Sequence, residues 1–259
     1  LFSDGDFSIS FDSLETIEFN SFITTGVTNM SAMFLQCDAL TSLDLSGWDV
    51  SSVTDMSYMF QSCSTSLTSV GDLSSWNVSS VTDMRCMFSV CERLTSVGDL
   101  SGWDVSSVTN MSYMFQNCSS LTSIGNLSGW DVTSVTDISD MFSGCSKLTS
   151  LDLSGWELTS VTNTTNVFTG CSGLVEVKAP KSIAAGKTLG LPTGKNWYVT
   201  TDTSAAVTEI GNGTTPVTLG KTIRVGVVVT FNPNGGSVNP TSALVVGGGA
   251  TTLPTPTRT

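Results

Sequence analysis

The chain has 259 residues, of which 39% are hydrophobic and only 12% are charged, so it can form a core but carries few charges for a globular protein. Its 22 Asp and Glu against 10 Lys and Arg give a formal net charge of -12, which disfavours binding to nucleic-acid phosphates and anionic membranes. The absence of histidine excludes Ser-His-Asp and Cys-His nucleophiles and histidine-based zinc sites.

The first residues carry no signal of export or membrane insertion. Leu1 opens the chain without a start Met or a basic region, and no apolar stretch reaches the length of a membrane span. We therefore expect a fragment of a longer protein that does not itself insert into a membrane. Residues 1–13 are predicted to form an N-terminal cap over the first open end of the core.

From residue 14 the sequence repeats itself, and the repeat covers residues 14–180. Valines and tryptophans recur in step with six cysteines at intervals of 26, 28, 27, 27 and 26 residues. Leu14 starts a divergent first unit, and Leu174, Val177 and Ala179 supply a closing strand before Pro180. The cysteines that mark the six full units are Cys37, Cys63, Cys91, Cys118, Cys145 and Cys171.

The unit from Leu40 to Cys63 opens with the L-x-x-L-x-L pattern of a leucine-rich-repeat strand. Met56, Met59 and Phe60 have the i, i+3, i+4 spacing that favours a short helix or 3₁₀ turn, with Thr54 or Asp55 as its N-cap. The extra Gly71 in some units predicts a bulge that keeps its apolar neighbours inside. The predicted fold is an α/β-type repeat solenoid, a leucine-rich repeat with a parallel sheet of about seven strands and short helical turns, stabilised by stacking of neighbouring units.

Composition changes at Pro180. Residues 181–226 combine glycines with β-formers, which predicts a small β cap or linker domain. Residues 227–259 open with a strand, an Asn-Gly turn and a second strand, and we predict a truncated β repeat there. The sequence therefore predicts a small C-terminal β region after the solenoid.

The repeat resembles the BspA-like leucine-rich-repeat bacterial surface proteins with V-T-[DN]-M-S-x-M-F-x-x-C units, which stand here at residues 53–63 and 108–118. The fifth unit departs by Ile138 and the sixth by Thr164 and Val167 in place of Met. Residues 229–238 and 253–258 look like the start of a Listeria–Bacteroides-type β repeat, without its usual Gly-Tyr-x-Phe-x-Gly-Trp continuation. Both resemblances imply adhesion at a bacterial surface, and neither offers a catalytic residue to carry over.

Cysteine and tryptophan each form a column of equivalent positions. The six thiols of the column, together with Cys86, could form disulfides or a metal ladder. However, seven cysteines are an odd number, and one per unit is not zinc-ligand spacing, so we favour buried free thiols. The tryptophans could stack carbohydrate, but their regular place between two extended stretches favours packing in the core or at its edge.

Three further columns are acidic or Asn. Two of them, which begin at Asp49 and Asn29, interchange Asp and Asn freely, so we interpret them as caps of turns. The third column lies on the predicted strand and alternates outward between inward leucines, either as solvated surface or as a binding face for a basic partner. A linear ladder lacks the converging oxygens of a calcium site, so no metal is predicted. This candidate ligand-binding face comprises Glu18, Asp44, Asp72, Asp99, Asn126 and Asp152.

The sequence favours a secreted or cell-surface bacterial adhesin or ligand-binding module, which recognises a host or microbial protein or glycan through the solenoid surface. The alternative is a structural spacer or stalk that displays another domain. Two carboxylates across the strand face could mimic a glycosidase pair, but nothing in the pattern forms a water-excluding cleft, so we do not expect an enzyme. We expect a monomer with no cofactor and no nucleic-acid partner, whose ligand is a host extracellular protein or glycan with a basic surface.

Overall fold

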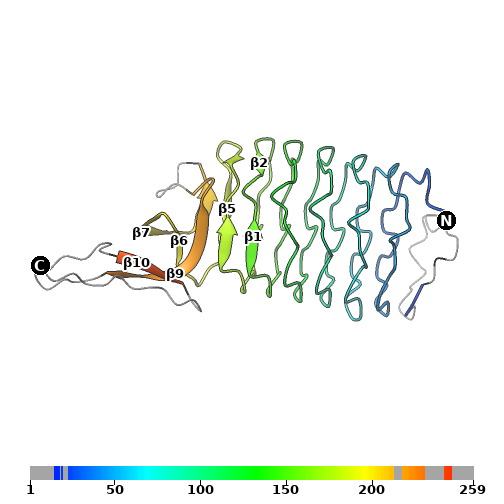
Figure 1. Ribbon diagram of the computed structural model, residues 1–259, viewed down its shortest axis with the longest axis horizontal. Helices are drawn as coiled ribbons and strands as arrows, with labels where there is room; N and C mark the ends of the chain where they lie inside the picture. Colours follow the sequence, from blue (N-terminus) through cyan, green and yellow to red (C-terminus); the bar gives the residue numbers. More distant parts are fainter. Residues whose placement is uncertain (1–14, 18, 20–22, 213–217, 231–241, 247–259) are drawn as a thin grey trace, which may run out of the picture.

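The computed structural model describes residues 15–17, 19, 23–212, 218–230 and 242–246. The chain forms an elongated stack of similar turns, which runs from the N-terminal side to a β region at the C-terminal end (Figure 1). The predicted cap at residues 1–13 lies outside the described residues.

The core of the stack consists of equivalent apolar side chains that lie on top of one another. Phe60, Phe88 and Phe115 are stacked with ring centroids 5.2 and 5.5 Å apart and nearly parallel planes. Leucines, valines, methionines and cysteines of successive repeats continue the same buried cluster from Met30 to the C-terminal β region. Each repeat is therefore stabilised by its neighbours, because no single repeat encloses its own apolar side.

Backbone hydrogen bonds join successive repeats in two opposite directions. The Thr82 N–H donates to the Thr54 carbonyl of the preceding repeat at 2.8 Å. The Met56 and Tyr58 N–H groups instead donate to the Asp83 and Arg85 carbonyls of the following repeat, at 3.0 and 2.9 Å. These alternating bonds satisfy backbone groups that would otherwise be unpaired between stacked turns.

The predicted α/β leucine-rich-repeat solenoid is wrong. Across the residues that the structure describes there is no helix, and the repeats carry isolated bridges and strands of two or three residues where a seven-stranded parallel sheet was expected. Ser69, for example, bridges Ser42 and Ser96 at a single position. Two residues later Gly71 has a φ of 78°, outside the extended region, so the ladder does not continue past it. Val70 and Leu73 on either side of this glycine are both buried, as expected.

The predicted helical turn after Asp55 is a series of β-turns. The Met59 N–H bonds to the Met56 carbonyl and the Cys63 N–H to the Phe60 carbonyl, and Tyr58 and Ser62 in these two turns have left-handed φ values of 61° and 60°. A helix would direct every N–H along its own axis, whereas here alternate N–H groups must reach the next repeat. Met56, Met59 and Phe60 are buried as expected, but the turns bury them without a helix.

Regular strands appear only toward the C-terminal end of the described chain. β1 (Ser150–Asp152) pairs in parallel with β3 (Glu176–Lys178), and β2 (Glu157–Leu158) pairs in parallel with β4 (Ser182–Ile183). β9 (Thr222–Thr230) then pairs antiparallel with β3, which ends the parallel stacking (Figure 1).

The remaining strands build on β9. β6 (Trp197–Val199) and β10 (Ser242–Val246) both pair antiparallel with it, and β7 (Asp202–Val207) pairs with β6. β5 (Thr188–Gly190) and β8 (Glu209–Gly211) form a separate antiparallel pair. β9 runs without a break through residue 226, the last residue of the predicted β cap or linker domain. The described part of the chain has no helix with the length and hydropathy of a membrane span.

Candidate functional site

The predicted ligand-binding face forms a row along the stack, which we call the strand-face row: Asp44, Asp72, Asp99, Asn126 and Asp152. The first four are exposed and Asp152 is half-buried, while Glu18 lies outside the described residues. In each member one side-chain oxygen accepts the backbone N–H two residues later; Ser101, for instance, donates to Asp99 Oδ1 at 2.9 Å. The side chains of the row are therefore held in place by Asx turns. The second carboxylate oxygen, Oδ2, of Asp44, Asp72 and Asp99 has no hydrogen-bond partner among the described residues.

These turns also keep the carboxylates charged. Hydrogen bonds from the Ser46 hydroxyl and N–H lower the pKa of Asp44, and the Ser101 N–H and hydroxyl lower that of Asp99. The pKa of Asp72 is lowered by Ser74 in the same way, although the charge of Asp99 one repeat away opposes this shift. The row therefore presents repeated negative charges, and the repulsion from Asp99 raises the pKa of Asp72 slightly against the effect of its turn.

The strand-face row ends on a lysine of this chain. Lys178 is the register partner of Asp152, and its Nζ lies 2.7 Å from Asp152 Oδ2. Burial raises the pKa of Asp152, but hydrogen bonds from Lys178 and Ser154 outweigh it and the pKa is lowered. Lys181 similarly lies 3.4 Å from Glu157, the last member of the column that follows the tryptophans. The last acidic residue of each of these two rows therefore already binds the ammonium group of a lysine in the following repeat.

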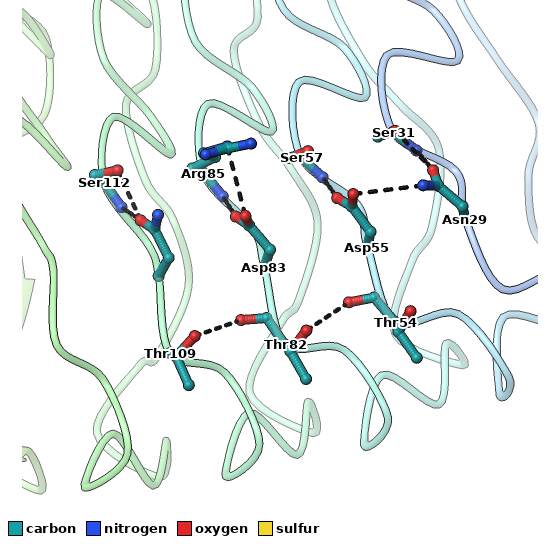
Figure 2. A network of polar contacts seen from close by, with 11 residues as sticks. Asn29, Ser31, Thr54, Asp55, Ser57, Thr82, Asp83, Arg85, Thr109 and Ser112 are labelled. Carbon is teal, nitrogen blue, oxygen red and sulfur yellow. Dashed lines mark hydrogen bonds and ion pairs between the residues drawn. The ribbon is translucent and has the colours of Figure 1, made fainter. Parts of the chain in front are cut away.

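The two columns interpreted as turn caps have that role in the structure, except at Glu157, which instead pairs with Lys181. Asp104 Oδ1 accepts the Ser106 N–H and hydroxyl, and Asn110 Oδ1 accepts those of Ser112. Figure 2 shows the second column, whose members lie one per repeat above a ladder of threonines. We call these the post-tryptophan row (Asp49, Asn77, Asp104, Asp131 and Glu157) and the pre-methionine row (Asn29, Asp55, Asp83, Asn110, Asp137 and Asn163).

The cysteine and tryptophan columns are parts of the core. All seven cysteines are buried and none of them is in a disulfide, as expected for small apolar side chains. The thiol of Cys118 donates to the Phe88 carbonyl at 3.0 Å, and burial raises the pKa of Cys91 and of Cys171 to about 12. Trp103 and Trp130 stack in parallel and donate from Nε1 to the Leu73 and Leu100 carbonyls, so they offer no sugar platform.

A surface cluster that sequence reasoning missed lies at the turns after the pre-methionine row. It consists of Tyr58, Arg85 and Tyr113, and we call it the tyrosine–arginine patch. The Arg85 guanidinium lies 5.2 Å from the Tyr58 ring centroid and 3.5 Å from the Asp83 carboxylate, and Tyr113 is 37% exposed. The available signal was a break in a column, because Arg85 stands where neighbouring repeats have serine.

The described residues contain no group of three or more His, Cys, Asp or Glu that could hold a metal ion. The acidic rows are linear, and the Asp44, Asp72 and Asp99 carboxylates each accept a hydrogen bond within their own Asx turn. In the pre-methionine row, Asp55 and Asp137 also accept from the side-chain amides of Asn29 and Asn163 in adjacent repeats. The arrangement is therefore suited to charge-based binding along a line.

Comparison with known proteins gives a family match. The model of the family described as "Mycoplasma protein of unknown function, DUF285" matches residues 6–97 and again residues 63–178, which together are more than half of the chain. No curated protein and no solved structure matches the chain. The double match agrees with a bacterial repeat protein of the BspA-like kind, while the particular repeat motif stays a prediction.

Proposed function

This chain belongs to the DUF285 family, and on that premise we propose that it is a binding module of a secreted or cell-surface bacterial adhesin. Its partner is a host or microbial extracellular protein with a basic surface, which binds along the strand-face row. The repeat units resemble those of BspA-like surface proteins, which supports a role in adhesion.

The observation that carries this proposal is the lysine seated at the end of the row. Asp152 receives the Lys178 ammonium at 2.7 Å, while the equivalent outward oxygens of Asp72 and Asp99 have no partner in the described structure. A partner that presents lysines or arginines would repeat the Asp152 contact at these positions. Since a single exposed ion pair contributes little, binding would depend on several pairs formed together.

The test is a binding screen of the recombinant chain against basic extracellular proteins, followed by the triple variant Asp44→Asn, Asp72→Asn and Asp99→Asn. Asparagine keeps the Asx turn, as Asn126 does in the same row, and removes only the charge. We expect at least a tenfold loss of affinity for any protein hit, and weaker binding of the unmodified chain at higher salt.

The matched control removes the same charge from another row through Asp55→Asn, Asp83→Asn and Asp137→Asn. If both triple variants bind as the unmodified chain does, the strand-face row is not the binding surface. If no protein binds at all, the elongated stack in Figure 1 favours the alternative, a spacer that displays another domain.

A further inference from the structure

We propose that the tyrosine–arginine patch binds a neutral, extended β-1,4-linked glycan, with one sugar ring stacked on Tyr113 and another packed against the Tyr58–Arg85 pair. This inference rests on the proposed binding role of the stack, but it assigns a different surface and a different class of ligand.

The two tyrosines occupy equivalent positions two repeats apart. The Tyr58 N–H bonds to the Arg85 carbonyl, the Cys86 N–H to the Ser112 carbonyl, and the Tyr113 N–H to the Ser139 carbonyl, so the three turns are in register. Tyr58, Cys86 and Tyr113 share left-handed φ values of 61°, 55° and 59°. The tyrosines therefore leave the backbone in the same direction, with a smaller side chain between them.

The spacing of the tyrosines suits a polysaccharide. Neighbouring repeats joined by backbone hydrogen bonds are about 4.8 Å apart, so side chains two repeats apart are separated by about 10 Å. One pyranose ring and its bridging oxygen advance an extended chain by about 5 Å, given covalent bonds of about 1.5 Å. Alternate sugars of such a chain also present the same face, so the first and third sugars can each meet one tyrosine.

The polar groups of the patch suit the hydroxyls of a sugar. Arg85 is held by the Tyr58 ring and by Asp83, yet its side chain is 44% exposed, so the guanidinium is a positioned donor that a ligand can reach. The turn around Tyr113 carries Gln116 and Asn117, which are half-buried and exposed respectively. Aromatic faces next to a planar donor match a ligand with a C–H face and a hydroxyl edge.

The same surroundings argue against a protein hot spot at this patch. Hot spots lie in dry pockets surrounded by well-packed contacts, whereas Tyr113 is flanked by polar side chains. The net charge of -12 further disfavours sulfated or uronic-acid glycans, and this is why we specify a neutral chain.

The experiment uses the three tyrosines of the chain as reporters. Tyr58 and Tyr113 lie in the patch and Tyr198 lies in β6, so a protein labelled with ¹³C in its tyrosine rings gives three assignable sets of NMR signals. The probes are the β-1,4-linked tetrasaccharides of N-acetylglucosamine and of glucose, with the corresponding disaccharides for comparison. We expect saturable shifts of the Tyr58 and Tyr113 signals, no shift for Tyr198, and at least tenfold tighter binding of one tetrasaccharide than of its disaccharide.

Two variants then test the roles within the patch. Tyr113→Ala should lower tetrasaccharide affinity at least tenfold, and Arg85→Ala should do the same, while Tyr198→Ala should leave it unchanged. The inference is overturned if no neutral glycan shifts the patch signals at millimolar concentration, or if Tyr198 shifts equally. Such a failure would leave the acidic-row test untouched, because that test measures protein binding and alters other residues.

Discussion

Val90 shows how much backbone strain a single residue of the turns carries. Its φ is 60°, a left-handed conformation that a β-branched residue rarely adopts. Gly144 and Gly170 occupy the equivalent position in later repeats with φ values of 77° and 75°. The repeat thus accepts glycine at this position, and the remaining side chains there cost conformational energy.

We predict that Val90→Gly stabilises the protein by about 1 kcal/mol, because relief of the left-handed strain exceeds the entropy that glycine loses on folding. Val175→Gly is the control, since this exposed valine is not among the positive-φ residues, and it should destabilise by a similar amount. Urea unfolding measures both variants. Equal destabilisation by the two would contradict the strain argument.

Titration of the buried thiols gives a second prediction at the scale of single residues. The pKa of Cys91 and of Cys171 is about 12 in the folded chain against an ordinary value of 9.0, so their contribution to stability is complete below pH 9 and is lost as the pH rises toward 12. Each thiol should lower the unfolding free energy by about 1 kcal/mol per pH unit in this window.

Urea unfolding from pH 8 to 10.5 checks this slope, with the double variant Cys91→Ala and Cys171→Ala for comparison. The double variant should be less stable at pH 8, because its side chains leave space in the core, but less sensitive to alkaline pH. An identical slope in both proteins would show that these thiols do not limit alkaline stability.

At the scale of one element, the corner before each tryptophan shows how equivalent positions differ. A Cβ added to Gly155 would lie 1.7 Å from the Ser128 carbonyl oxygen, whereas one added to Gly102 meets nothing within 4 Å. Ser75 stands at this position in another repeat, so a side chain is compatible with the corner itself. Among the four glycines at this corner, Gly47, Gly102, Gly129 and Gly155, the backbone of the neighbouring repeat comes close only at Gly155.

Gly155→Ala should accordingly destabilise the protein by about 2 kcal/mol or more, since the contacting atom belongs to the backbone and cannot rotate away. Gly102→Ala should be neutral or slightly stabilising. Thermal unfolding of the two variants measures the difference, and similar melting temperatures would refute a close approach at Gly155.

This pair of glycines also marks the limit of what the sequence predicts. The period and the buried columns could be predicted, because apolar residues at the positions of Leu45, Trp48 and Val50 recur in the repeats from residue 40 on, where they are buried. The conformation of the turns could not, since the spacing of Met56, Met59 and Phe60 suits a helix and a series of β-turns equally. Tyr58 and Ser62 gave no warning of left-handed backbone, a conformation usually signalled by glycine.

The candidate site divides in the same way. The strand-face row could be listed from its alternation with leucines, but its Asx turns and the Lys178 contact to Asp152 depend on register between repeats. The tyrosine–arginine patch could not be predicted, because Arg85 interrupts a serine column and a repeat pattern identifies only what its members share. A site made by a residue that departs from the repeat can be recognised only once the structure shows what that residue contacts, as it does for Arg85 over the Tyr58 ring.

At the scale of the whole molecule, stability should depend on the number of stacked repeats. The contacts described above join adjacent repeats: Thr109 bonds back to Thr82, Met111 bonds forward to Asp137, and Phe115 lies between Phe88 and Phe142. Removal of one whole period therefore leaves equivalent partners facing each other. Deletion of residues 109–135 would bring Thr136 to the position of Thr109 and Asp137 to that of Asn110.

We predict that this deletion variant folds. Its unfolding free energy should depend less steeply on denaturant concentration, because the variant buries less surface. Its unfolding midpoint should be lower, because one interface between repeats is lost. Near-UV circular dichroism of the buried tryptophans checks the packing, and urea unfolding checks the stability. Deletion of residues 109–122 is the control, since it removes half a period, brings unlike side chains into each column and should abolish the near-UV signal. Loss of that signal in both variants would mean that the repeats are not interchangeable units, and that differences among them, such as the close approach at Gly155, decide whether the stack forms.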